Sequence, residues 1–228
     1  MQKLDQVVFS GFTHEPAVAL SERLIPLLPG NQSRLFFSDN GSTAVEVAIK
    51  MALQYHFNKG RKKQVLLAFE EGFHGDTFGA MSVSGLSVYN GPFEDLSLEV
   101  RRIPVPMTDA PDAILQQLDA LLNENEVAAF IYEPLVQGAA AMKVHNRNGL
   151  GRILSFLRER GILLIADEVM TGFGKTGTRF ASEQLETSPD IICLSKALTA
   201  GLLPMAVTSC SEEIFDAFYS DRLSDGFF

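Results

Sequence analysis

The stretch Ile162–Gly177, ILLIADEVMTGFGKTG, decides the fold when it is taken together with Ile191–Gly201, IICLSKALTAG. Each stretch opens with an apolar run that is typical of a strand buried on both faces. The first run ends in Asp167 and its neighbouring glutamate, and the second ends just before Lys196. If the two runs are adjacent parallel strands, a carboxylate and a lysine meet at the C-terminal edge of the sheet, where α/β proteins bind their ligands.

Short apolar runs alternate with amphipathic segments along the rest of the chain. This alternation predicts an α/β fold with a mostly parallel, helix-covered sheet. The predicted strands are residues 34–38, 64–69, 127–132, 162–166, 191–194 and 205–208. The predicted helices are residues 43–57, 111–123, 150–160 and 211–219. The segment 84–107 contains several Gly and Pro residues and is predicted to be a long surface connection.

The segment 38–42, Ser-Asp-Asn-Gly-Ser, lies between a predicted strand and the predicted helix 43–57. Thr43 and Glu46 fit a capping box at the start of that helix. Backbone N–H groups at a helix start, together with a hydroxyl, can bind a phosphate. The same residues also fit a plain turn with an N-cap, so this segment alone leaves both interpretations open.

A second loop, Gly72–Thr77 (GFHGDT), follows the predicted strand 64–69. The aromatic ring of Phe73 could stack on a flat cofactor at the edge of the sheet, or it could simply pack within the loop. His74 could act as a general base, but a hydrogen-bonded structural role is the more common one for such a histidine.

The composition restricts the class of protein. With 228 residues the chain can bury a full core, and its net charge of −9 argues against nucleic acid or an anionic membrane as the main partner. No apolar stretch is long enough to span a membrane, and no signal peptide is apparent. The two cysteines, Cys193 and Cys210, do not indicate a disulfide framework and favour the reducing cytoplasm. No zinc-spaced Cys/His set is present, so no metal site is predicted.

Asp167 and Lys196 together match the requirements of pyridoxal 5'-phosphate. A carboxylate beside the pyridine nitrogen favours the protonated ring, which is the electron sink of this cofactor. Lys196 would hold the cofactor as an imine and, once freed by a substrate amine, could transfer protons. Lys196 could instead be a surface lysine at a helix start, but the small residues of 197–201 favour a tight site.

Several motifs resemble those of the class III aminotransferases, which are fold type I pyridoxal-phosphate enzymes. They are SDNGSTAVEVAIKMALQY (38–55), GFHGDTFGAMSVSG (72–85), IYEPLVQGAAAM (131–142), ILLIADEVMTGFGKTG (162–177) and LSKALTAG (194–201). The runs GSTAVEV and GDTFGAMS are most similar to the biotin-pathway branch of the class. The resemblance covers most of the chain from about residue 13 onward.

The resemblance implies roles for individual residues. Lys196 would carry the cofactor and Asp167 would pair with the pyridine nitrogen. Gly41 and Ser42 would hold the phosphate. Phe73, where many relatives have tyrosine, would cover the ring and border the substrate. Gln137 would reach the ring oxygen of the cofactor.

The resemblance also implies a function and an organisation. The expected reaction moves an amino group from S-adenosylmethionine to 8-amino-7-oxononanoate in a cytoplasmic homodimer with shared active sites; lysine is an alternative donor. Another ω-aminotransferase, of the ornithine or 4-aminobutyrate type, and a catalytically silent fragment are the alternatives. Residues 1–33 are expected to form an N-terminal lead-in, and residues 34–228 a large cofactor-binding domain that is incomplete and lacks its small domain.

Overall fold

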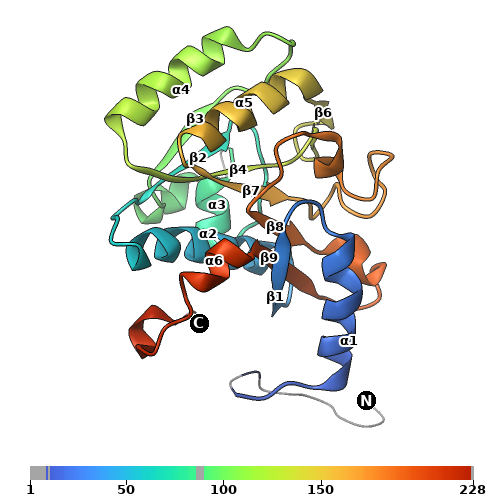
Figure 1. Ribbon diagram of the computed structural model, residues 1–228. Coiled ribbons are helices and arrows are strands. Elements are labelled where there is room, and N and C mark those ends of the chain that lie inside the picture. The colour runs from blue at the N-terminus through green and yellow to red at the C-terminus, as the bar shows by residue number, and fades with distance from the viewer. Residues whose placement is uncertain (1–8, 10, 86–89, 227–228) are drawn as a thin grey trace.

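The computed structural model describes residues 9, 11–85 and 90–226, and its centre is a seven-stranded sheet (Figure 1). The spatial order of the strands is β1-β9-β8-β7-β4-β2-β3. Their bounds are β1 (Gln32–Ser38), β2 (Val65–Phe69), β3 (Val100–Ile103), β4 (Val127–Tyr132), β7 (Leu163–Asp167), β8 (Ile191–Leu194) and β9 (Ala206–Ser211). The neighbouring pairs β3–β2, β2–β4, β4–β7 and β7–β8 are parallel. Strand β9 is antiparallel to both β8 and β1. The predicted mostly parallel sheet is therefore confirmed.

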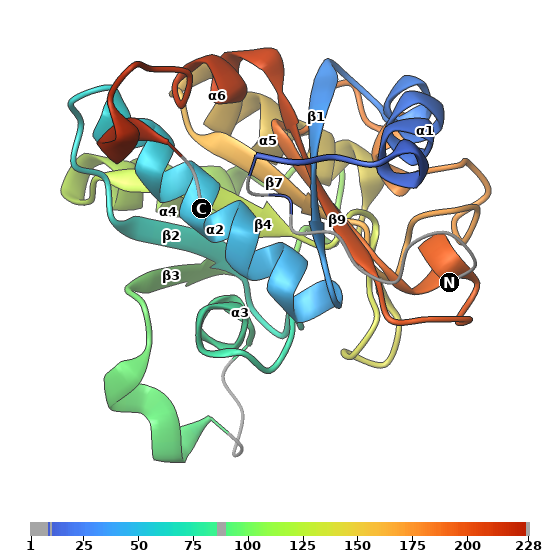
Figure 2. The same cartoon turned by 90° about the horizontal axis from the view of Figure 1, so that it is seen from below.

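Helices cover both faces of the sheet (Figures 1 and 2). The bounds of the helices are α1 (Glu15–Leu24), α2 (Gly41–Asn58), α3 (Phe78–Val83), α4 (Asp112–Glu124), α5 (Arg147–Glu159) and α6 (Glu212–Asp216). α2 and α3 pack on one face, α4 and α5 pack on the other, and α1 lies beside the edge strand β1. A separate two-stranded sheet is formed by β5 (Val136–Gln137) and β6 (Lys143–Val144).

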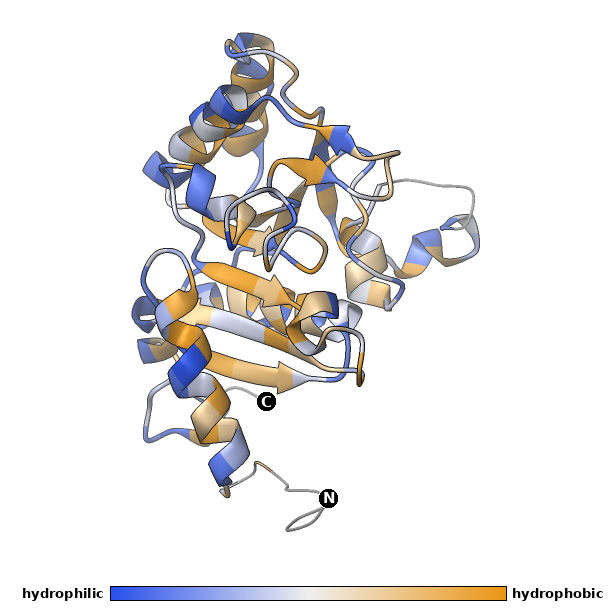
Figure 3. Cartoon of the chain, turned by 90° about the vertical axis from the view of Figure 1, so that its right-hand side faces the viewer, coloured by the Kyte–Doolittle hydropathy of each residue, from blue (hydrophilic) through white to orange (hydrophobic). Residues whose placement is uncertain are grey.

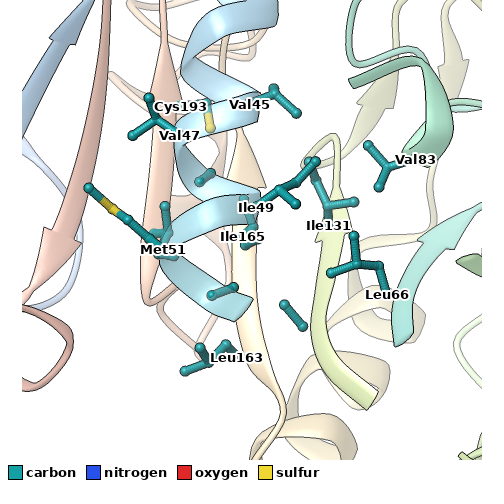
Figure 4. Close-up of a cluster of buried hydrophobic side chains, with 14 of the residues drawn as sticks. Val45, Val47, Ile49, Met51, Leu66, Val83, Ile131, Leu163, Ile165 and Cys193 are labelled. Carbon is teal, nitrogen blue, oxygen red and sulfur yellow. The ribbon is translucent and has the colours of Figure 1, made fainter. Parts of the chain in front are cut away.

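The strands supply the core of both layers because their side chains alternate between the two faces. Leu66 and Ala68 of β2 face the α2 side, whereas Leu67 and Phe69 face the α4–α5 side. Figure 4 shows the first cluster, in which side chains of α2 pack against those of β4 and β7. Full burial of one large aliphatic side chain contributes about 1.5–3 kcal/mol. In Figure 3, which colours each residue by hydropathy, the strands are mostly hydrophobic and the helices carry hydrophilic stretches.

The predicted capping box at the start of α2 is wrong. The helix begins at Gly41, and Asn40 is its N-cap: the Asn40 side chain accepts a hydrogen bond from the backbone N–H of Thr43 (3.0 Å), and the Thr43 hydroxyl accepts one from the N–H of Asn40 (3.1 Å). Glu46 lies one turn further on. Its carboxylate accepts hydrogen bonds from the hydroxyl of Thr77 (2.5 Å) and from two N–H groups of α3 (2.7 and 3.1 Å).

The prediction that residues 84–107 form only a surface connection is wrong as well. The segment contains the short helix Gly91–Leu96 and the strand β3, which extends the sheet beyond β2. Two arginines in the sequence VRRI obscured the apolar pattern of β3, and charged residues are common on such edge strands. Residues 86–89 of this segment lie outside the described residues.

The helices α1 and α3 and the strands β5 and β6 were not predicted, and the other differences concern the ends of elements. The predicted helix 211–219 is shorter, because α6 covers only Glu212–Asp216 with Ser211 as its N-cap.

Both cysteines are free and buried. None of the helices in the described ranges is long and apolar enough to cross a membrane.

A buried histidine in the α4–α5 layer makes stability depend on pH. His145 is 4% exposed, and its ring packs edge-on against Phe69 with 5.3 Å between ring centroids. Neither ring nitrogen has a hydrogen-bond partner among the described residues. Burial, and secondarily the charge of Lys143, lowers the pKa of His145 from 6.5 to about 4.

We expect the free energy of unfolding to decrease as the pH falls from about 7 toward 4, because the unfolded chain binds a proton in this range that folded His145 does not. Each pH unit between the two pKa values corresponds to about 1.4 kcal/mol. His145→Phe should reduce this dependence, while leaving the part that arises from His56, whose pKa burial also lowers. Urea unfolding of both proteins at pH 7 and pH 4.5 measures the difference. An unchanged pH dependence in the variant would contradict this account.

Candidate functional site

A cavity of about 570 Å³ lies where the C-terminal ends of four strands meet the start of α2. Residues that follow β2, β4, β7 and β8 line it, which places it at the sheet edge where α/β proteins bind ligands. The lining residues are Asn40, Gly41, Ser42, Phe73, His74, Gly75, Glu133, Gly138, Ala139, Met142, Asp167, Val169, Met170, Ser195 and Lys196.

Asp167 and Lys196 line this cavity together. Asp167 is the last residue of β7, and Lys196 comes two residues after the end of β8. β7 and β8 are parallel neighbours, with Asp167 opposite Cys193. The two strands are therefore adjacent, as the sequence suggested. A carboxylate and an amine that follow neighbouring strands line the same cavity.

Asp167 is fixed by two hydrogen bonds. Its Oδ2 lies 2.7 Å from Nδ1 of His74, and its Oδ1 accepts the backbone N–H of Val169 at 3.1 Å. An ionised carboxylate can only accept, so His74 donates from Nδ1. The side chains of His74 and Asp167 are 1% and 5% exposed, and Nε2 of His74 has no partner among the described residues. This buried pair leaves the Asp167 carboxylate little freedom to rotate.

Lys196 is exposed, and its backbone has an unusual conformation. Its φ is 42°, in the left-handed region that non-glycine residues rarely adopt. It begins the short helix Lys196–Thr199, and the hydroxyl of the preceding Ser195 donates to the carbonyl of Met205 at 2.8 Å. Such conformations cluster at functional sites, because the surrounding structure has to hold them in place.

The start of α2 and the loop after β2 approach each other closely at the rim. Gly75 has a φ of 129°, and a Cβ at this position would lie 2.2 Å from Oγ of Ser42. The backbone N–H of Asp76 donates to the same hydroxyl at 3.3 Å. Gly41 is also confined, though less tightly, since a Cβ there would lie 2.9 Å from a methyl group of Val169. The helix N-terminus and a hydroxyl are thus presented to the cavity.

Phe73 and Gln137 have different positions. Phe73 lines the cavity and is 45% exposed, so one part of its ring is free. Gln137 is fully buried and is not among the lining residues; its amide donates to the carbonyl of Glu70 at 2.7 Å. The structure therefore brings Gly41, Ser42, Phe73, Asp167 and Lys196 together and places Gln137 behind the wall.

The second carboxylate at the end of β7 has a different environment. Glu168 is 1% exposed and accepts hydrogen bonds from the hydroxyl of Thr171 (2.5 Å), the N–H of Ala181 (3.1 Å), and the N–H and hydroxyl of Ser182 (2.7 and 2.8 Å). Burial raises the pKa of its carboxyl, and these donors oppose the increase. Glu168 holds the loop 169–184 in place and does not line the cavity.

The hydrogen-bond partners of two site residues, His74 and Glu133, could not be assigned from the sequence. The contact between His74 and Asp167 joins positions 93 residues apart, and Glu133 accepts a hydrogen bond from the N–H of Phe73, 60 residues away. The available signal was positional: each residue lies at or just after the end of a predicted parallel strand. That signal indicates a shared edge, but it does not indicate which side chains touch.

We expect Gly75→Ala to destabilise the fold and displace Ser42. The new methyl group would overlap the Ser42 hydroxyl, and overpacking of this kind typically costs about 1–3 kcal/mol. Gly174→Ala is the control, because Gly174 also has a large positive φ (99°) and nothing lies within 4 Å of its Cβ position. Urea unfolding should show a loss at Gly75 that exceeds the loss at Gly174. Equal losses would mean that backbone strain alone, and not the approach to Ser42, determines the effect.

Solved structures similar to this chain include transaminases. The adenosylmethionine-8-amino-7-oxononanoate aminotransferase of Methanocaldococcus jannaschii matches with a TM-score of 0.91 and 32% identity, over 100% of this chain and 53% of that one. An amine transaminase from an uncultivated Pseudomonas species, solved in its PLP-bound form, matches with a TM-score of 0.85 and 33% identity, over 96% and 54%. The chain has the α/β fold of the large domain of fold type I pyridoxal-phosphate-dependent transaminases.

The sequence identifies the family. The family described as Aminotransferase class-III matches residues 1–227, so the chain belongs to the class III aminotransferases. The adenosylmethionine-8-amino-7-oxononanoate aminotransferase of Synechococcus elongatus is 47% identical over 99% of this chain and 55% of its own length. The protein of the same name from Staphylococcus aureus is 39% identical over 97% and 52%. The chain spans about half the length of the curated relatives it matches.

Proposed function

We propose that the cavity binds pyridoxal 5'-phosphate and that the protein is a transaminase of the biotin pathway. One observation carries the proposal: Asp167 and Lys196 come from neighbouring parallel strands and line the same cavity as the N-terminus of α2. These are the three charge elements that the cofactor requires, namely an anion for the pyridinium nitrogen, an amine for the aldehyde, and a helix start for the phosphate.

The residues present fit this cofactor. Lys196 would supply the amine that holds it covalently, and Asp167 would face the pyridine nitrogen. Ser42 and the N–H groups that follow Asn40 would hold the phosphate, whose negative charge the helix start favours. Phe73 has a partly free ring that would lie against the face of the cofactor. Gln137 is assigned to the ring oxygen by resemblance, and it would have to reach that atom from behind the wall.

When bound, the cofactor supplies an electron sink for charge that develops at the substrate carbon. His74 would keep Asp167 oriented by donating from Nδ1, so that the carboxylate remains an acceptor for a protonated ring. Lys196 would carry a proton between the substrate carbon and the cofactor once its amine is free. Its exposed position at the mouth of the cavity allows a substrate amine to reach it.

We propose 8-amino-7-oxononanoate as the acceptor and S-adenosylmethionine as the donor. Two relatives with this name cover almost the whole chain at 39–47% identity, and they support this choice. The donor amine would become a carbonyl, and the 7-oxo group of the acceptor would become an amine. Phe73 would border the substrate without offering the hydroxyl that a tyrosine would have.

We further propose that the protein works as a cytoplasmic homodimer with shared active sites. The turn that follows Lys196 exposes Leu202 and Leu203, which are 82% and 62% exposed. Two large exposed aliphatic side chains beside the site suit a surface that a partner subunit covers. Cys193 and Cys210 are free thiols, as expected in a reducing compartment.

Lys196→Ala tests the cofactor assignment. Pyridoxal phosphate added to the 228-residue chain and reduced with borohydride should become fixed at Lys196, and peptide mass spectrometry locates the adduct. The variant should lose both the adduct and the associated visible absorbance. Lys175→Ala is the control, because Lys175 is exposed and lies outside the cavity lining. An adduct mainly at another lysine, or an undiminished adduct in Lys196→Ala, would contradict the assignment.

Substrate profiling tests the proposed reaction. We expect 7,8-diaminononanoate to form from S-adenosylmethionine and 8-amino-7-oxononanoate, with lysine in place of S-adenosylmethionine as a parallel reaction. Product formation can be measured by mass spectrometry. Activity with ornithine or 4-aminobutyrate and 2-oxoglutarate, and none with the oxononanoate, would reject the biotin-pathway assignment in favour of another ω-aminotransferase.

A further inference from the structure

Glu133 is a buried carboxylate at the site to which the proposed chemistry assigns no role. It comes directly after β4, the strand that lies between β2 and β7. It is 5% exposed and lines the same cavity as Asp167. A carboxylate in such a position is costly unless its oxygens are hydrogen-bonded. Its partners therefore indicate why it is there.

Each oxygen of Glu133 accepts a backbone N–H from a different loop. Oε1 accepts from Phe73 at 3.1 Å, in the loop that follows β2. Oε2 accepts from Gly138 at 2.9 Å, in the turn that joins β5 to β6. Both loops line the cavity, the first through Phe73, His74 and Gly75 and the second through Gly138, Ala139 and Met142. One side chain thus connects two walls of the site.

Other contacts between these two segments lie further from the cavity. Gln137 donates to the carbonyl of Glu70 from behind the wall, and Lys143 forms an ion pair with Glu71 whose side chains are 34% and 58% exposed. Exposed ion pairs typically contribute little to stability. Hydrogen bonds to a buried charged group are stronger, so the Glu133 contacts should dominate the position of the two loops near the cavity.

Burial and the backbone donors act in opposite directions on the charge of Glu133. The pKa of the Glu133 carboxyl is raised, mainly by burial and also by the charge of Asp167, and the N–H of Gly138, the nearby His74 and the N–H of Phe73 oppose this increase. The two backbone donors favour the ionised form, in which both oxygens can accept. An amide in this position could accept from only one of the two N–H groups, because its nitrogen is a donor.

We propose that Glu133 is a positioning residue that braces the Phe73 loop against the Gly138 turn, and thereby sets the width of the cavity in which the cofactor ring lies. The bracing itself follows from the two hydrogen bonds. Its consequence for the cofactor rests on the proposed function, because Phe73 is there the residue that covers the ring.

Hydrogen exchange of the cofactor-free chain, measured by mass spectrometry, tests the bracing without any ligand. Glu133→Ala removes both acceptors and should speed exchange at the amides of Phe73 and Gly138 by about tenfold or more. Glu133→Gln removes one acceptor and should speed exchange mainly at one of them. Glu71→Gln, which removes the charge of the exposed link between the same segments, should change neither. The helix Arg147–Glu159 should exchange as in the unmodified chain in all three variants.

Titration with pyridoxal phosphate, followed by absorbance, tests the consequence for the site. Glu133→Ala should weaken binding by about tenfold, since small displacements of positioning groups have effects of this order or larger. Glu71→Gln should bind as the unmodified chain does. If Glu133→Ala fails to fold, Glu133→Gln decides both measurements.

The outcomes separate the two proposals. Unchanged exchange at both amides would overturn the bracing. Faster exchange with unchanged cofactor affinity would overturn the coupling to the site. If the unmodified chain binds no cofactor, that result counts against the proposed function, while hydrogen exchange still decides whether Glu133 braces the loops. A general loss of protection that includes Arg147–Glu159 in Glu133→Gln would mean that Glu133 stabilises the whole fold and does not act locally.

Discussion

The buried hydrogen bond between Asp167 and His74 is the interaction on which the site depends. It joins the end of β7 to the loop after β2, across the end of β4 that lies between them. Burying a carboxylate away from water is unfavourable unless donors compensate for the lost hydration. Both oxygens of Asp167 have such donors within the fold, so the carboxylate is held at the cavity wall in one orientation before any ligand arrives.

The three carboxylates at the ends of β4 and β7 show how one sheet edge can support different tasks. Asp167 lines the cavity, Glu168 turns away from it and holds the loop 169–184, and Glu133 connects two walls. Each is nearly fully buried, and each accepts hydrogen bonds from backbone N–H groups. The three side chains carry the same carboxyl group. Their roles differ because different loops supply the hydrogen-bond donors.

Much of this architecture could be predicted from the sequence. The apolar runs before Asp167 and Lys196 are unbroken, so both strands and their parallel arrangement were predicted, and the residues delivered at their ends followed. The strand β3 was missed because two arginines interrupt its pattern, and the cap of α2 was misplaced because both Asn40 and Thr43 are suitable N-cap residues. Local sequence does not decide between two adequate caps.

The side-chain contacts within the site could not be predicted in the same way. Which residue faces Asp167 depends on the strand order and on the register of three parallel strands, and neither is encoded in local spacing. The partial exposure of Phe73 and the burial of Gln137 are likewise consequences of how the loops after β2 and β4 meet. The sequence could thus indicate the edge and the chemistry, but not the partners.

A crystal structure of the chain grown with pyridoxal phosphate would test the central claim most directly. The account predicts continuous density from Nζ of Lys196 to the cofactor, the pyridine nitrogen within hydrogen-bonding distance of Asp167, and the phosphate at the start of α2. Cofactor bound elsewhere on the chain, or bound in the cavity with its ring nitrogen turned away from Asp167, would contradict it.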